Sequence, residues 1–270
     1  MSISDILGKA TSQLREAGIE SARLDCMILL EDVVGKDRGW ILAHTEYELS
    51  EAQMSTLETG LARRVHHEPL AYIRSKIEFY GREFYVDQHV LIPRPETESF
   101  IGLLKSTLLN TKYTHILDLG SGSGCIGITL ALEIPRLVVT LADVDKTTLK
   151  VARRNAALLG AEVTYKQTDL LSTITEQYDV IVTNLPYVPD SYPTTTIAFE
   201  PKQALFAGKD GLDLYRAFWR QVDDKVTKPK VIATESLLSQ HSAQTKLALR
   251  AGYQISDTDS LVQLFIAQEV

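Results

Sequence analysis

The chain has 270 residues, of which 44% are hydrophobic and 23% are charged, and its formal net charge is −7. These values are ordinary for a globular protein of one or two domains. The sequence contains no apolar run long enough to span a membrane, and its first residues lack the basic and apolar regions of a secretion signal. The negative charge argues against a general nucleic-acid-binding protein, because phosphate binding depends on Lys and Arg.

The two cysteines, Cys26 and Cys125, lie far apart and match no metal-ligand spacing. We therefore expect no metal site, and we expect a reducing, cytoplasmic location. The sequence leaves the oligomeric state open, and a monomer is the default expectation.

The first part of the chain is predicted to be helical. Apolar residues recur at helical spacing in 3–18 and 20–35, and both segments end in glycine. A third helix is expected from Ser50. The segment 78–93 is rich in aromatic and β-branched residues around Gly81, which predicts a hairpin. A connecting helix is then expected from Pro95.

From residue 114 the sequence alternates between predicted strands and helices, which indicates a mainly parallel sheet covered on both faces. The last two strands have no helix between them, so we expect them to pair as an antiparallel hairpin. This pattern is typical of the class I methyltransferase fold, an α/β Rossmann-like domain with a seven-stranded sheet. The expected strands are 114–120, 137–144, 161–169, 178–184, 229–235, 253–259 and 261–268, and the expected helices are 125–135, 147–160, 210–222 and 242–252.

A glycine-rich loop follows the first of these strands and precedes a helix, which is where open α/β sheets bind ligands. Glycine allows the backbone to turn tightly and to approach a ligand closely. A dinucleotide fingerprint would need its third glycine at Cys125, so the spacing favours S-adenosylmethionine instead. The residues expected to contact this cofactor are Gly120, Ser121, Gly122, Ser123 and Gly124.

Acidic residues end the second strand of this region. Asp143 is expected to accept hydrogen bonds from the two ribose hydroxyls, whereas Asp145 is better placed to cap the next helix. After the third strand, Asp169 could hold the exocyclic amine of the adenine and Leu170 could pack on the ring. An ordinary loop role remains the alternative for both.

The fourth strand runs directly into Asn184-Leu185-Pro186-Tyr187. An amide nitrogen is a poor nucleophile, because its lone pair is delocalised into the carbonyl. The side-chain oxygen of Asn184 and the backbone carbonyl of Leu185 could each accept one N–H of such a group and turn its nitrogen toward a methyl donor. Tyr187 could stack on the planar target. Asn184 and Tyr187 are the candidate catalytic residues, and all four residues are expected to bind the substrate.

Nearly the whole chain resembles the protein-(glutamine-N5) methyltransferase family that modifies peptide chain release factors. The most specific match is Pro93-Arg94-Pro95-Glu96-Thr97-Glu98. Further matches are Ala22–Leu24, Arg63-Arg64, Glu68–Ile73, Phe79–Gly81, Phe84–Val86, Val90–Ile92, Glu200-Pro201, Ala204–Phe206 and Gly208–Leu212.

The resemblance implies three parts and a substrate. Residues 1–68 would form a small all-α domain that docks the release factor, 69–95 a hairpin linker, and 96–270 the S-adenosylmethionine-dependent methyltransferase domain. The substrate would be the glutamine of the Gly-Gly-Gln motif in class 1 release factors. Residues Gly120 to Gly124, Asp143, Leu170 and Asn184 would contact the cofactor.

Two departures from the family pattern stand out. Leu185 replaces the proline that usually occupies the second position of the tetrapeptide; Leu keeps the backbone carbonyl but loses the fixed φ of proline. The segment 71–75 lacks a glycine that the family tends to carry. Two residues outside the motifs are candidates for the cleft: Arg94, which lies between prolines, and Glu235, which ends the fifth strand.

Two other functions use similar residues. A nucleic-acid amino-methyltransferase, acting on adenine N6 or guanine N2, shares the tetrapeptide, but it would need a basic face that this acidic chain does not suggest. A release-factor or cofactor-binding module without catalysis would be the outcome if Leu185 had abolished methyl transfer.

Overall fold

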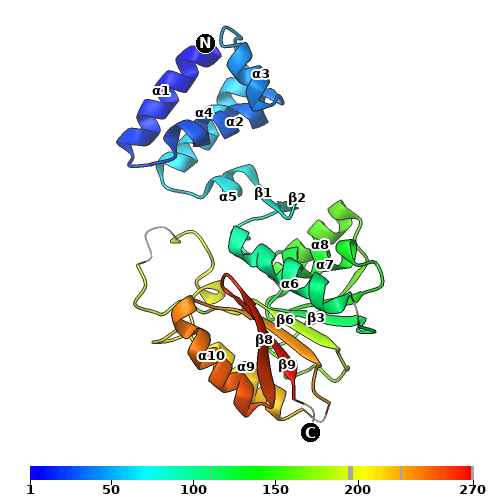
Figure 1. Cartoon of the computed structure of the whole chain (residues 1–270). Helices are drawn as coiled ribbons and strands as arrows, with labels where there is room; N and C mark the ends of the chain where they lie inside the picture. The colour runs from blue at the N-terminus through cyan, green and yellow to red at the C-terminus, as the bar shows by residue number, and fades with distance from the viewer. Residues whose placement is uncertain (110, 194–196, 226, 269–270) are drawn as a thin grey trace. The chain divides into compact units, whose positions relative to one another are not determined.

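The computed structural model describes residues 1–109, 111–193, 197–225 and 227–268 (Figure 1). The chain forms two compact units, Met1–Lys76 and Ile77–Val270. None of the helices in the described ranges is long and apolar enough to cross a membrane.

The first unit is helical, as the sequence predicts. Ser2 caps its first helix, and Ser50 and Gln53 form a capping box at the fourth. The structure adds two short helices that periodicity did not predict. The helices are α1 (Ile3–Glu16), α2 (Ala22–Val34), α3 (Arg38–Ala43), α4 (Glu51–Val65) and α5 (Leu70–Arg74).

The second unit begins with the predicted hairpin, in which β1 (Lys76–Phe79) pairs with β2 (Arg82–Tyr85). Its two-residue turn, Tyr80-Gly81, has φ values of 50° and 69°. Two consecutive residues with positive φ make the type I′ geometry that matches the twist of the flanking strands. The hairpin is followed by η1 (Pro95–Glu98) and α6 (Ser99–Leu108).

The rest of the second unit is the seven-stranded mixed sheet of the class I methyltransferase fold, with strand order β5-β4-β3-β6-β7-β9-β8. The first five strands pair in parallel, and β9 pairs antiparallel with both β7 and β8. These elements are β3 (His115–Leu119), α7 (Cys125–Glu133), β4 (Val138–Asp143), α8 (Lys146–Leu159), β5 (Val163–Gln167), β6 (Val180–Thr183), η2 (Lys202–Ala204), α9 (Asp213–Asp223), β7 (Val231–Glu235), η3 (Leu238–Gln240), α10 (His241–Arg250), β8 (Tyr253–Asp259) and β9 (Val262–Ala267).

Two hydrophobic clusters cover the two faces of the sheet. In β6, Val180 and Val182 belong to the cluster under α6, α7 and α8, while Ile181 belongs to the cluster under α9 and α10. Successive strand residues point to opposite faces, so an apolar strand of this kind must be covered on both sides. Figure 1 shows the two helical layers on either side of the sheet.

The strand order reverses between β3 and β6, since β4 and β5 lie on one side and β6 and β7 on the other. A crevice opens at such a point beyond the carboxyl ends of the strands, and ligands bind there. The loops that follow β3, β4 and β6 carry the predicted cofactor and substrate residues.

Helix α7 packs closely on the sheet at Gly127. A Cβ atom there would lie 2.3 Å from Leu141 Cδ2 and 2.8 Å from Asp118 Oδ2. We expect Gly127→Ala to destabilise the protein by about 1–3 kcal/mol, because the core must shift to admit the methyl group. Gly102→Ala in α6 is the matched control: nothing lies within 4 Å of its added Cβ, so urea unfolding should detect no loss of stability. Equal stability of the two variants would contradict this packing argument.

Candidate active site

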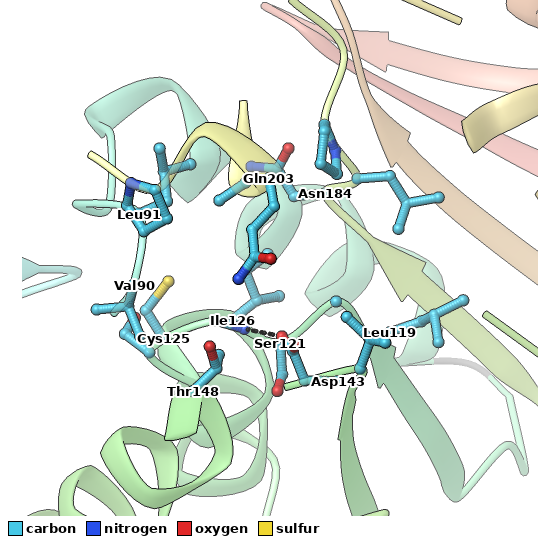
Figure 2. Close-up of a pocket in the computed structure, with 18 of the residues that line it drawn as sticks. Val90, Leu91, Leu119, Ser121, Cys125, Ile126, Asp143, Thr148, Asn184 and Gln203 are labelled. Atoms are coloured by element: carbon cyan, nitrogen blue, oxygen red, sulfur yellow. Dashed lines mark hydrogen bonds between the residues drawn. The ribbon is translucent and has the colours of Figure 1, made fainter. Parts of the chain in front are cut away.

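A pocket lies at the carboxyl ends of β3, β4 and β6, where the strand order reverses (Figure 2). It brings together most of the residues that the sequence singles out. Two predicted residues, Gly124 and Tyr187, are not part of its lining. The predicted residues that line it are Gly120, Ser121, Gly122, Ser123, Asp143, Leu170, Asn184, Leu185 and Pro186.

The glycine loop is held by its own backbone and by β4. The N–H groups of Gly120 and Ser121 both donate to the carbonyl of Ala142, at 2.8 and 3.0 Å. Gly120, Gly122 and Gly124 have φ values of 70°, 55° and 81°, which is the left-handed region that favours glycine. Gly124 caps α7, so it shapes the loop from outside the pocket.

Asp118, in β3 just before the glycine loop, holds the first turn of α7 after it. Its side chain is fully buried; Oδ2 accepts the N–H of Gly127 at 2.8 Å, and Oδ1 has no partner within the described residues. Burial raises the pKa of Asp118 to about 7, with a smaller contribution from the charge of Asp143. At neutral pH, roughly half of this carboxyl group is therefore protonated.

This raised pKa predicts a pH dependence of stability. Between the usual Asp pKa of 3.8 and about 7, the folded protein holds a proton on Asp118 that the unfolded chain releases. Its contribution to stability therefore falls as pH rises through this window, with a slope of up to about 1.4 kcal/mol per pH unit. Asp118→Asn, a neutral isostere, should gain stability relative to the parent between pH 5 and pH 8. A pH-independent difference in urea midpoints would contradict the raised pKa.

Asp143 and Asp145 stand at and just after the end of β4, and the predicted capping role of Asp145 is confirmed. Asp145 caps α8, with its side chain accepting the N–H of Thr147 at 2.7 Å. Asp143 lines the pocket; its oxygens accept the N–H groups of Gly122 and Asp145, both at 3.1 Å. Burial raises the pKa of Asp143. A carboxylate with two oxygens keeps further acceptor positions after these two bonds.

Leu170 lies in the pocket wall with a φ of 48°, which is rare for a residue with a side chain. The hydroxyl of Thr168 donates to the carbonyl of Leu170 at 3.0 Å and holds this turn. Asp169 also lines the pocket. The wall next to β4 and β5 thus offers one apolar side chain and one carboxylate.

The tetrapeptide leaves β6 and places Asn184, Leu185 and Pro186 in the pocket wall. Tyr187 is not part of the pocket lining, and its hydroxyl donates to Glu235 Oε1 at 2.8 Å. Glu235, at the end of β7, is 1% exposed. Burial raises its pKa, and the polar side chains of Thr97, Tyr187 and Asn184 oppose that rise. The second carboxylate oxygen, Oε2, has no hydrogen-bond partner in the part of the chain that the structure describes.

Several pocket residues were not predicted. His89, Val90 and Leu91, from the segment after β2, form one wall, and the hydroxyl of Thr148 donates to the carbonyl of His89 at 3.0 Å. Gln203 in η2 extends its side chain into the pocket (Figure 2). Val90 and Leu91 belong to a family-specific sequence match, and Gln203 lies between two others, Glu200-Pro201 and Ala204–Phe206. These matches are the signal that could have marked both segments.

Arg94 borders the cleft, as anticipated. It lines the pocket and forms an ion pair with Glu200, whose side chain is almost completely buried. The other oxygen of Glu200 accepts the N–H of Ile92 at 3.1 Å. Glu200 therefore joins the segment before η1 to the segment before η2, and both segments line the pocket.

Comparison with known proteins identifies the family. Residues 5–74 match the family described as PrmC N-terminal domain, and residues 100–202 match the methyltransferase small domain. The release factor glutamine methyltransferase of Koribacter versatilis is 39% identical over 82% of this chain and 81% of its own length. The chain belongs to the release factor glutamine methyltransferase family. The relative of that name from Bacillus anthracis is 36% identical over 87% of this chain and 86% of its own length.

Some relatives are longer than this chain. The bifunctional methyltransferase of Rickettsia conorii is 34% identical over 94% of this chain, which spans 54% of that protein. Solved structures support the fold of the methyltransferase. A methyltransferase from Pyrococcus furiosus aligns with a TM-score of 0.54 at 16% identity, covering 78% of this chain and all of the other. The N2 G1207 methyltransferase of T. thermophilus 16S rRNA, solved with AdoMet and guanosine, aligns with a TM-score of 0.51 at 17% identity over 72% of this chain and 50% of that one.

Proposed function

We propose that this methyltransferase transfers a methyl group from S-adenosylmethionine to the side-chain nitrogen of the glutamine in the Gly-Gly-Gln motif of a class 1 peptide chain release factor. The observation that carries the proposal is one pocket that joins the glycine loop after β3 to Asn184, Leu185 and Pro186 after β6. The relatives named release factor glutamine methyltransferase support the choice of substrate.

The pocket fits S-adenosylmethionine. The carboxylate of Asp143 would accept the ribose hydroxyls, Leu170 would pack on the adenine, and the loop from Gly120 to Ser123 would lie along the methionine part. Positive φ values at Gly120 and Gly122 let the loop pass close to a ligand without a Cβ atom between them. The cofactor, when bound, supplies an electrophilic methyl group on a sulfonium centre.

The residues of the chain would orient the target nitrogen. The Asn184 side chain would direct its NH2 group to an oxygen of the Glu235 carboxyl group, which can accept a hydrogen bond in either protonation state. Its Oδ1 would then face the pocket and accept one N–H of the glutamine, and the carbonyl of Leu185 would accept the other. The nitrogen lone pair would point at the methyl group. Such positioning by fixed dipoles accelerates a reaction without a covalent intermediate.

Tyr187 would not touch the target glutamine in this arrangement. Its hydroxyl is held by Glu235, and burial together with the neighbouring carboxylate raises the pKa of Tyr187, so the hydroxyl stays protonated. Stacking of its ring on the glutamine amide would require the side chain to move. Tyr187 therefore serves the substrate either as a mobile ring or as a support for the turn.

The helical unit would dock the release factor, and the hairpin would link it to the catalytic domain. A monomeric state and a location in the cytoplasm remain predictions. Methyl transfer from labelled S-adenosylmethionine tests the proposal, with an intact release factor, the same factor carrying Gln→Ala in its Gly-Gly-Gln motif, and duplex DNA or RNA as acceptors. Label only in the intact factor is the expected result. Label in nucleic acid would instead support an amino-methyltransferase acting on bases.

A further inference from the structure

Tyr215 of α9 is fully buried beneath the tetrapeptide and takes no part in the mechanism described above. Its hydroxyl oxygen lies 3.3 Å from the backbone nitrogen of Leu185, 2.6 Å from the carbonyl oxygen of Glu235 and 3.4 Å from that of Thr183. A hydroxyl has one donor and two acceptor positions. The Tyr215 hydroxyl therefore donates its proton to the nearer carbonyl, that of Glu235, and its oxygen accepts the N–H of Leu185.

Leu185 has a particular need for this acceptor. Strand β6 ends at Thr183, and the ladder that pairs β6 with β3 and β7 ends there too. Leu185 is 5% exposed, so water has little access to the residue. A buried backbone N–H without a partner is unfavourable, and the Tyr215 hydroxyl is the hydrogen-bond acceptor that this N–H has within the described residues. A proline at position 185 would have no N–H and would need no acceptor.

The bond fixes the peptide group between Asn184 and Leu185. Only the φ and ψ torsions of Leu185 then separate this fixed group from the carbonyl of Leu185, and Pro186 restricts the residue before it to extended values. On the other side of the turn, the carbonyl of Tyr187 accepts Gln240 Nε2 at 2.8 Å. The tetrapeptide backbone is thus held at two points, and the first of them is the tyrosine hydroxyl.

We propose that Tyr215 is a positioning residue: through the N–H of Leu185 it fixes the substrate-binding carbonyl of that residue, in place of the rigidity that a proline would provide. This inference rests on the proposed glutamine methyl transfer. Burial raises the pKa of Tyr215, so the hydroxyl keeps its proton throughout the working pH range.

The first test compares Tyr215→Phe with Tyr253→Phe. Tyr253 is a matched control, because it is also fully buried in the cluster under α9 and α10. Its hydroxyl donates to the carbonyl of Pro229 at 2.7 Å, and in the described part of the chain it has no hydrogen bond to the tetrapeptide. Both variants should lose similar stability. Only Tyr215→Phe should lower kcat, by about tenfold, with the dissociation constant for S-adenosylmethionine unchanged. Equal kcat values in the two variants would overturn the proposal.

The second test is a double-mutant cycle with Leu185→Pro. Because proline has no N–H, Tyr215→Phe should lower kcat much less in the Leu185→Pro background than in the parent. An equal loss in both backgrounds would show that Tyr215 acts through some other contact and would overturn the proposal.

A third measurement does not depend on the substrate or on the folding of the proline variant. Hydrogen exchange at the Leu185 amide should be faster in Tyr215→Phe than in Tyr253→Phe at equal global stability. If the parent protein fails to methylate any release factor while this difference in exchange is present, the proposed function fails and the positioning contact stands. If exchange is equal in the two variants, the positioning role fails whatever the substrate.

Discussion

Asn184→Ala is expected to reduce kcat for release-factor methylation by about 100- to 1,000-fold. The substitution removes the side-chain oxygen that would accept one N–H of the target amide, and it leaves the pocket otherwise intact. Because the amide nitrogen depends on this acceptor for its orientation, the loss should be in kcat rather than in binding of the release factor. Initial rates with labelled S-adenosylmethionine measure the effect.

The control for this prediction is cofactor binding. Asn184 also lines the pocket proposed for the cofactor, so the dissociation constant of S-adenosylhomocysteine should change by no more than about tenfold, the effect of about one hydrogen bond. Titration calorimetry of the variant separates the two effects. A variant that keeps most of its kcat would remove Asn184 from the catalytic role. A variant that neither binds cofactor nor folds would be uninformative, and Asn184→Ser, which keeps a small polar group, would replace it.

Asp143→Ala is expected to weaken cofactor binding by roughly 10- to 100-fold, the effect of losing hydrogen bonds to a charged acceptor. Two causes act together. The ribose hydroxyls lose their carboxylate, and the N–H of Gly122 loses the acceptor that lies 3.1 Å away. At saturating S-adenosylmethionine the kcat should recover, because Asp143 does not touch the target nitrogen in the proposed arrangement.

Asp145→Ala is the matched control for Asp143→Ala. It removes a carboxylate two residues away that caps α8 through Thr147, so it should lower stability by about 1 kcal/mol without a comparable loss of affinity. If the two variants bind S-adenosylmethionine equally well, Asp143 does not hold the ribose.

Much of the fold could be predicted because its elements are long or strongly patterned. The alternation of apolar strands with helices, and the two final strands without a helix between them, led to the mixed sheet that the structure confirms. The position of the hairpin also followed from composition, because Gly81 can adopt the positive φ that the turn requires. The same reasoning placed the capping carboxylate of Asp145 correctly.

The remaining features depend on tertiary contacts that no local pattern encodes. Helices α3 and α5 have six and five residues, too short for periodicity to distinguish them from loops. The supports of the tetrapeptide come from distant parts of the chain: Tyr215 from a helix, Glu235 from the end of another strand. Residue types alone could not show that the Tyr187 hydroxyl bonds to Glu235 or that Tyr187 lies outside the pocket lining.

Only part of the pocket could be predicted from local sequence patterns. The glycine loop and Asn184 were predictable because their spacing after strands is set by the chemistry of a ligand at the sheet edge. Gln203 and the segment from His89 to Leu91 carry no such spacing. Contacts between distant parts of the chain hold their segments, namely those of Glu200 with Arg94 and the N–H of Ile92, and that of Thr148 with His89.

The most direct test of the central claim is to locate the transferred methyl group. Release factor incubated with this protein and S-adenosylmethionine would be digested, and the peptide that contains the Gly-Gly-Gln motif would be sequenced by tandem mass spectrometry. We expect one added methyl group on the side chain of that glutamine, and none when Asn184→Ala replaces the parent protein over the same time. A methyl group on any other residue, or an unmodified peptide from a parent protein that binds S-adenosylmethionine, would contradict this expectation.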